Sequence, residues 1–293
     1  MSALLAHQET IGSRYNPSIK RIRRLRDREE RDRSGEYYIE GLRFVLQALH
    51  HSAEIELLVV CPTLIVHGAA RQVMRRLARM GVPILQVTPE VLHHLSLLDE
   101  PQGIGAVVRQ RWTHLERAYP ANALCWIALD SVRSPGNLGT ILRTADAVGG
   151  AGLIVLGDAI DPHDPTTVRA SMGAMFAQRL VRTALPAFIH WKRHHCCQLV
   201  GTSPGARLDY HATHYRQPTI LLMGDERSGL SAELQALCDL MVRIPMVGRS
   251  DSLNLAIATS VLLYELFNQQ RERRGGPSPS RSRASRCLGT ANR

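Results

Sequence analysis

Short apolar runs alternate with longer amphipathic segments in the second half of the chain. The apolar runs lie at 123–129, 153–156, 198–201, 219–223 and 242–244. Apolar residues recur at helical spacing at about 138–148, 165–176, 231–240 and 253–271. The runs lack the inside–outside alternation of a half-exposed sheet, so we predict a parallel sheet covered by helices on both faces. Such a sheet binds its ligands at the carboxyl ends of the strands.

The first half of the chain has a smaller α/β pattern. We predict strands at 37–40, 54–60 and 82–87, helices at 41–50 and 69–80, and an end to this unit near Val108. Residues 18–33 are rich in arginine and carry Ile19, Ile22 and Leu25 at helical spacing, which indicates a basic amphipathic helix.

These patterns divide the chain into four parts. Residues 1–108 form an N-terminal domain, and the polar stretch 109–122, which has no clear periodicity, is a linker. A second domain covers 123–271. Residues 272–293 carry almost no large apolar side chain, so we expect a disordered basic tail there.

Positive charge gathers in two arms. The formal net charge is +10, yet 14–33 contributes +5 and 271–293 contributes +6, which leaves −1 for the rest. Clustered cations favour a polyanion such as RNA, although a solvated, solubilising surface would have the same composition. As RNA-binding candidates we select four residues of the first arm, namely Lys20, Arg21, Arg23 and Arg24.

Other features argue against a membrane, a secreted protein or a metal centre. No run of eighteen apolar residues occurs, and the first residues lack the order of a secretory signal, so we expect a cytoplasmic protein. The six cysteines are scattered, as reduced structural cysteines are. The stretch at 194–197 (HHCC) has no second pair of ligands, so we expect no metal.

Polar residues follow the apolar runs where a ligand site belongs. After the run at 123–129, the segment PGNLGTILRTA starts a helix, with Asn137 as the expected N-cap. Arg143 lies early in this helix, where a cation opposes the helix dipole, which favours a ligand role over a stabilising one. A capped helix with a surface arginine is the alternative.

Three further segments follow the same logic. VRASMGA packs small residues into a helix, which allows another backbone or a ligand to approach closely. LLMGDERSGLS runs from a buried strand into a loop that carries Glu226. In SDSLNLAIA, Ser252 and Asn254 flank a helix start, so one could cap the helix while the other faces a ligand.

The four segments, in this order and at these separations, resemble the successive motifs of the SpoU/TrmH class of RNA ribose 2′-O-methyltransferases. The N-terminal half, with NPSIKRIRRLRD and YYIEGLRFVLQAL, is similar to the substrate-binding domain often fused ahead of these enzymes. The resemblance implies a deep trefoil knot, a homodimer, and S-adenosylmethionine as cofactor, with no metal.

The resemblance also implies roles for single residues. It places catalysis on Asn137, Arg143, Glu226, Ser252 and Asn254. Cofactor binding falls on Thr202, Gly224, Ile244 and Leu253. Family members commonly have an uncharged residue where this chain has Asp225.

The predicted reaction is methyl transfer from S-adenosylmethionine to a ribose hydroxyl of RNA, with ribosomal RNA favoured by the separate N-terminal domain. A guanidinium is a poor base, so Arg143 acts either on the proton or as a stabiliser of the oxyanion. Transfer RNA is the nearer alternative substrate. A non-catalytic RNA-binding member would have lost Arg143, Asn254 or the cofactor loops, and all of them are present.

Overall fold

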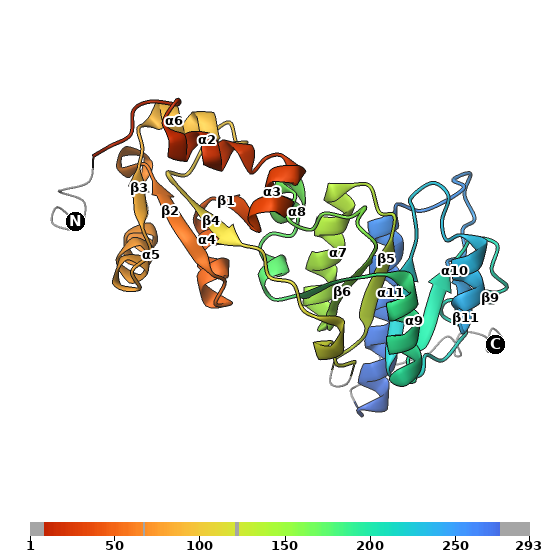
Figure 1. Ribbon diagram of the computed structural model, residues 1–293. Coiled ribbons are helices and arrows are strands. Elements are labelled where there is room, and N and C mark those ends of the chain that lie inside the picture. The colour runs from red at the N-terminus through yellow and green to blue at the C-terminus, as the bar shows by residue number, and fades with distance from the viewer. Residues whose placement is uncertain (1–8, 67, 121–122, 276–293) are drawn as a thin grey trace, which may run out of the picture.

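The computed structural model describes residues 9–66, 68–120 and 123–275, which form two lobes side by side (Figure 1). Each lobe has its own β-sheet, of four strands in the first and seven in the second.

The N-terminal α/β domain holds the four-stranded sheet, in the order β1-β4-β2-β3. Its strands are β1 (Glu36–Glu40), β2 (Ile55–Val60), β3 (Ile84–Gln86) and β4 (Ile104–Arg109). β4 runs antiparallel to β1 and β2, whereas β2 and β3 are parallel. The helices are α2 (Pro17–Arg24), α3 (Arg28–Ser34), α4 (Leu42–His50), α5 (Gly68–Arg79) and α6 (Pro89–Leu95).

The prediction of one continuous basic helix at 18–33 was wrong, because two short helices, α2 and α3, replace it. The chain is extended at Asp27, which occupies the N-cap position of α3 with φ −85° and ψ 133°. Ile19 and Ile22 face the core from α2, and α3 buries Arg31. The sequence reading also missed α6, although Thr88 caps it and Pro89 occupies its first turn.

The second domain holds the predicted parallel sheet, in the order β7-β6-β5-β10-β8-β11-β9. Every strand pair in it is parallel. The strands are β5 (Trp126–Asp130), β6 (Gly152–Leu156), β7 (Arg179–Thr183), β8 (Gln198–Thr202), β9 (Leu208–Asp209), β10 (Thr219–Met223) and β11 (Leu240–Arg243). The helices are α7 (Pro135–Val148), α8 (Pro165–Ala170), α9 (Leu185–His194), α10 (Ala232–Leu237) and α11 (Leu255–Arg273).

Several predicted boundaries in this domain were wrong. The helix expected at 165–176 ends at Ala170, because Met172 and Gly173 have φ +53° and +93°, and a short 3₁₀ turn follows at 174–176. β7, α9 and β9 were not predicted. α11 runs to Arg273, two residues into the predicted tail, and 276–293 lie outside the described residues. The knot stays a prediction.

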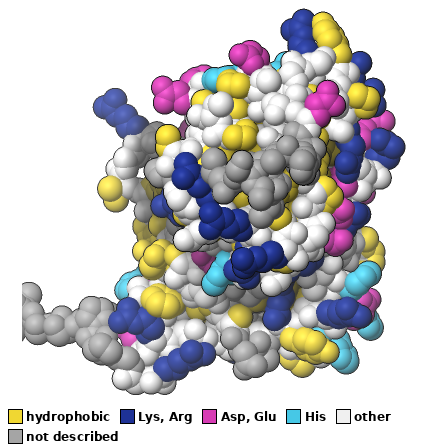
Figure 2. Space-filling view, turned by 90° about the vertical axis from the view of Figure 1, so that its left-hand side faces the viewer, with side chains coloured by type: hydrophobic (Ala, Val, Ile, Leu, Met, Phe, Trp, Pro, Cys, Tyr) yellow, Lys and Arg dark blue, Asp and Glu magenta, His cyan; other side chains and the backbone are white. Residues whose placement is uncertain are grey.

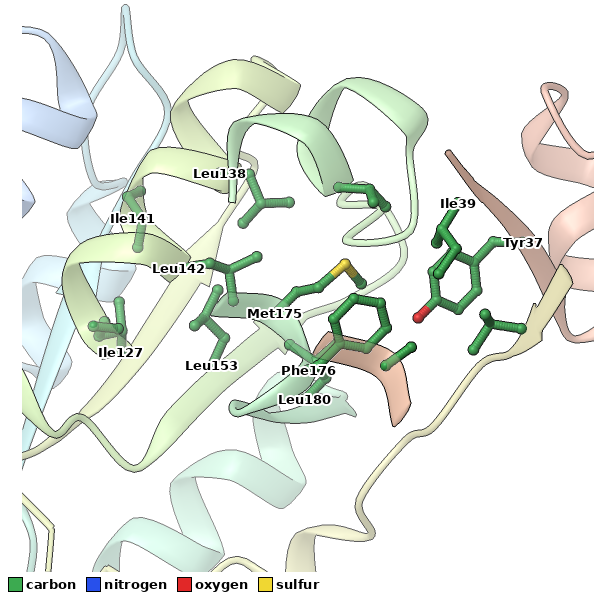
Figure 3. Close-up of a cluster of buried hydrophobic side chains, with 14 of the residues drawn as sticks. Tyr37, Ile39, Ile127, Leu138, Ile141, Leu142, Leu153, Met175, Phe176 and Leu180 are labelled. Carbon is green, nitrogen blue, oxygen red and sulfur yellow. The ribbon is translucent and has the colours of Figure 1, made fainter. Parts of the chain in front are cut away.

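The two domains share one apolar core (Figure 3). Tyr37 and Ile39 of β1 face Met175 and Phe176 of the second domain. Beside this core the buried Arg31 guanidinium lies 2.5 Å from a carboxylate oxygen of Asp161, which joins α3 to the second domain.

The polar segment expected to be a linker is packed against the domains in the part that is described. Its Trp112 packs against the shared core, and the Thr113 amide donates to the Leu180 carbonyl. Ala118 is fully buried. The domains therefore have a defined relative orientation, which matters for any ligand that touches both.

Candidate active site

The start of α7 lies at the carboxyl end of β5, and its cap differs from the prediction. The Ser134 hydroxyl, not Asn137, accepts from the helix, at 3.4 Å from the Asn137 amide nitrogen. Pro135 takes the first helical position. The predicted N-cap role of Asn137 was wrong, because Pro135 and Gly136 are already helical, and its side chain is available for other segments.

Glu226, in the loop after β10, holds this helix start. Its two carboxylate oxygens accept from the backbone amides of Arg133 and Ser134 at 3.2 and 3.1 Å, and from Asn137 Nδ2 at 3.1 Å. Burial raises the pKa of Glu226, but these hydrogen bonds outweigh burial, so its pKa lies below the ordinary value. The carboxylate is therefore an ionised clamp between two loops.

Asn254 connects a third segment to Glu226 and Asn137. Its Nδ2 donates to Asn137 Oδ1 at 2.9 Å, while its own Oδ1 caps α11 by accepting from the amides of Ala256 and Ile257. Of the two polar residues flanking this helix, Asn254 is thus the cap and Ser252 lines a cavity. A chain of side chains, Glu226 to Asn137 to Asn254, ties three distant segments together.

A cavity of about 900 Å³, including its solvent-filled mouth, opens beside this chain. Loops after β8, β10 and β11 and the start of α11 line it. Six predicted residues are in the lining, namely Thr202, Gly224, Glu226, Ile244, Ser252 and Leu253. The sequence reading missed lining residues from the same segments, including Leu230, Gln235, Val242, Met246, Leu255 and Ala258. Except for Gln235, these side chains are apolar and gave no signal distinct from core positions.

Asp225 shapes the loop on one side of the cavity. Its carboxylate accepts from the amides of Ser228 and Arg227 at 3.0 and 2.9 Å and lies 2.9 Å from the Arg133 guanidinium. These bonds lower its pKa to about 2. A Cβ on Gly224 would lie 2.3 Å from the Gly229 carbonyl oxygen, so the loop closes only over a glycine.

Arg143 does not line the cavity of its own chain. It is exposed on α7, beyond Asn137. No hydrogen bond or ion pair of its side chain occurs in the described part of the chain, so the guanidinium is available to an external group.

The predicted RNA-binding residues are only partly available. Arg21 pairs with Glu36 at 2.6 Å, and Arg23 donates to the His94 carbonyl at 2.7 Å. Lys20 lies over the Tyr15 ring, and Arg24 is exposed. Arg21 and Arg23 therefore help to hold the N-terminal domain together.

Comparison with known proteins agrees with this arrangement. Residues 125–264 match the SpoU rRNA Methylase family, and residues 16–106 match the MRM3-like substrate binding domain. The 23S rRNA (uridine(2479)-2′-O)-methyltransferase of Streptomyces viridochromogenes is 34% identical over 262 residues, covering 87% of this chain and 90% of that protein. The chain belongs to the SpoU rRNA methylase family. Its resemblance to the SpoU/TrmH class is thereby confirmed.

Other family members are similar over nearly the whole chain. The 23S rRNA (guanosine(2553)-2′-O)-methyltransferase RlmP of Bacillus subtilis is 29% identical over 258 residues, covering 87% of this chain and 98% of that protein. A crystal structure of an AdoMet-bound rRNA methyltransferase from Sinorhizobium meliloti superposes with a TM-score of 0.82 at 38% identity, covering 90% of this chain and 98% of that one.

The described residues contain neither a membrane-spanning helix nor a cluster of metal ligands. No helix among them is both long and apolar enough to span a membrane. Within the same residues, no group of three or more His, Cys, Asp or Glu side chains is arranged to hold a metal ion.

Proposed function

We propose that this protein transfers the methyl group of S-adenosylmethionine to a ribose 2′-hydroxyl of ribosomal RNA. The observation that carries the proposal is the convergence of three family motifs, through Glu226, Asn137 and Asn254, beside one cavity. The names of the relatives from Streptomyces viridochromogenes and Bacillus subtilis support 23S ribosomal RNA as the substrate class.

The cavity fits the cofactor in the chemistry of its lining. Ile244, Leu253 and Leu255 offer apolar surface for an adenine ring, and the hydroxyl groups of Thr202 and Ser252 offer partners for polar groups. When bound, S-adenosylmethionine supplies a methyl group already activated on its sulfonium.

The remaining task of the protein is to align the ribose hydroxyl and to manage its proton. The Glu226 carboxylate is occupied by three donors, so we assign it to positioning the start of α7. Arg143 has no partner among the described residues, and we assign it to the ribose oxygen or a neighbouring phosphate.

We also propose a homodimer that forms along α11. Leu253, Ile257 and Tyr264 are 38%, 52% and 48% exposed on or beside this helix and offer apolar surface to a partner. Leu253 also lines the cavity, so a partner on this surface would lie beside the cofactor. An active site completed by the partner's Arg143 would explain why Arg143 stands apart from the cavity of its own chain.

Light scattering tests the dimer, with Ile257→Asp as the disrupting variant and Leu46→Asp, another exposed apolar position, as its control. We expect a dimeric wild type and control, and a monomeric, inactive Ile257→Asp. A fully active monomer would contradict the dimer proposal.

Mapping of ribose methylation tests the reaction and its substrate. The gene is deleted, and ribosomal and transfer RNA from the deletion strain and its parent are compared for loss of single 2′-O-methyl groups. We expect one methylated site to be lost from ribosomal RNA. Purified protein and S-adenosylmethionine should restore it in vitro, also in the presence of EDTA. A site lost only from transfer RNA would show that transfer RNA is the substrate class. A base-methylated product would refute the proposed reaction. We also propose that the protein is located in the cytoplasm.

A further inference from the structure

The outer face of α5 carries an unusual set of charges. Between residues 57 and 89 the chain has four arginines, Arg71, Arg75, Arg76 and Arg79, and no Asp, Glu or Lys. All four are exposed on α5, while Val73, Met74 and Leu77 on its other face are buried. The helix is thus an amphipathic element with a purely cationic solvent face.

These arginines have no partner among the residues that the structure describes. In the described part of the chain, none of the four makes an ion pair or a side-chain hydrogen bond. Their spacing is also unfavourable for the isolated helix, because Arg71 and Arg75, and again Arg75 and Arg79, are like charges four residues apart. Arg76 and Arg79 lie in the last turn, where a cation suits the helix dipole, but this does not account for Arg71 and Arg75. The run of four unpaired arginines therefore needs another explanation.

Several arginines elsewhere in the same domain have acidic partners. On α3, Arg28 pairs with Asp32 at 3.3 Å, and Arg33 pairs with Glu30 at 2.5 Å. On α2, Arg21 pairs with Glu36. The usual solution for a solvated basic face, alternation with acids, is thus present on α3 and absent from α5.

We propose that the outer face of α5 binds the phosphate backbone of the RNA substrate, away from the methylated nucleotide. The inference rests on the proposed function for the identity of the polyanion. Guanidinium groups bind phosphate oxygens in a bidentate manner, and contacts of this kind position an RNA without reading its bases. Arg71, Arg75 and Arg79 are spaced about 6 Å apart along the helix axis, which suits a row of successive contacts to one backbone.

The position of α5 defines what the substrate must look like. α5 lies at the end of the N-terminal domain that is remote from the sheet of the second domain (Figure 1). The face turned toward the viewer in Figure 2 shows Lys and Arg side chains gathered across its middle, with most Asp and Glu side chains toward its margins. Because the shared core fixes the two domains, an RNA that reaches both α5 and the cavity must span the length of the molecule. The substrate class is therefore a long, structured RNA.

The test compares two triple variants that remove the same charge. Arg71→Gln, Arg75→Gln and Arg79→Gln together change α5, and glutamine preserves the helix propensity. The matched control changes three exposed arginines outside the N-terminal domain, Arg117→Gln in the linker and Arg179→Gln and Arg193→Gln in the second domain. Fluorescence anisotropy measures the binding of a labelled RNA duplex of arbitrary sequence over a series of salt concentrations.

We expect the α5 variant to bind the duplex about tenfold more weakly and to reduce the slope of log K against log salt by about two to three. The control should bind as the wild type does, and a triple Arg→Lys variant of α5 should recover the salt slope, because it keeps the three charges. Circular dichroism and S-adenosylmethionine titration confirm that each variant is folded.

An α5 variant that is folded and has the affinity and salt slope of the control would overturn the proposal. That result would leave the methyl transfer intact, because duplex binding is measured without turnover. Conversely, loss of duplex binding together with no methylated ribosomal or transfer RNA would refute the proposed reaction and leave α5 as an RNA-binding surface.

Discussion

At the scale of single residues, the same side-chain type has different roles according to its partners. Arg31 is buried and paired, Arg133 lies against Asp225, and Arg143 has no partner among the described residues. The unpaired one is the candidate for chemistry, because a charge that does not stabilise the fold is available to a substrate.

Replacement of Arg143 tests its role in the chemical step. We expect Arg143→Ala to reduce the single-turnover rate by about a hundred- to ten-thousand-fold, equivalent to roughly 3 to 5 kcal/mol of barrier, with cofactor affinity retained. Recovery by Arg143→Lys would indicate that charge alone suffices, whereas a rate as low as that of alanine would indicate bidentate positioning. A normal rate for Arg143→Ala would remove it from the mechanism.

The lowered pKa of Asp225 predicts that the stability of the protein depends on pH. Its folded pKa of about 2 lies below its ordinary value of 3.8, so its stabilising contribution is complete above that value and is lost as pH falls toward 2. Asp225→Asn keeps an oxygen for the two backbone amides but does not titrate, so the wild type should lose stability relative to this variant in that acid range.

Urea unfolding midpoints measured across the acid range check this prediction. Asp99→Asn serves as control, because Asp99 is exposed and makes no side-chain hydrogen bond or ion pair within the described residues. A difference between wild type and Asp225→Asn that stays constant down to the lowest pH would contradict the predicted titration.

At the scale of elements, the site depends on the close packing of α7 on α8. A Cβ on Gly139 would lie 2.4 Å from the Ala170 Cβ and 2.6 Å from the Thr167 carbonyl oxygen. The small residues of VRASMGA thus allow a close approach, as predicted, and the partner is the helix that carries Asn137 and Arg143.

Gly139→Ala should therefore destabilise the protein by about 1–3 kcal/mol, because α8 must shift to admit the methyl group. Gly136→Ala is the matched control on the same helix, since its Cβ would meet nothing nearer than Ser134 Oγ at 3.8 Å. Urea unfolding compares the two variants. Equal stabilities would show that α8 moves away at little cost.

At the scale of the whole molecule, a buried ion pair and an apolar core hold the domains in one orientation. The Arg31 side chain is only 2% exposed, and it donates to the Leu25 and Arg26 carbonyls as well as to Asp161. Its loss would leave the partly buried Asp161 carboxylate without its cation.

Arg31→Ala should lower the free energy of unfolding by about 3–5 kcal/mol. Arg33→Ala, which removes a 69% exposed partner of Glu30 from the same helix, should have almost no effect. Chemical denaturation measures both. Similar losses in the two variants would show that the interdomain pair is not a determinant of stability.

The sequence by itself determined the parallel sheet and the N-terminal α/β domain, because apolar runs and helical spacing are local signals. Six of the residues that line the cavity followed from the resemblance to the SpoU/TrmH class. Only the tertiary structure decided which distant side chains meet Asn137 and which arginines are available for RNA. Ser134, Glu226 and Asn254 meet at Asn137 from three segments, and Glu36 and His94 occupy Arg21 and Arg23. Hydrogen bonds and ion pairs depend on distance in space, which a one-dimensional pattern of residues does not contain.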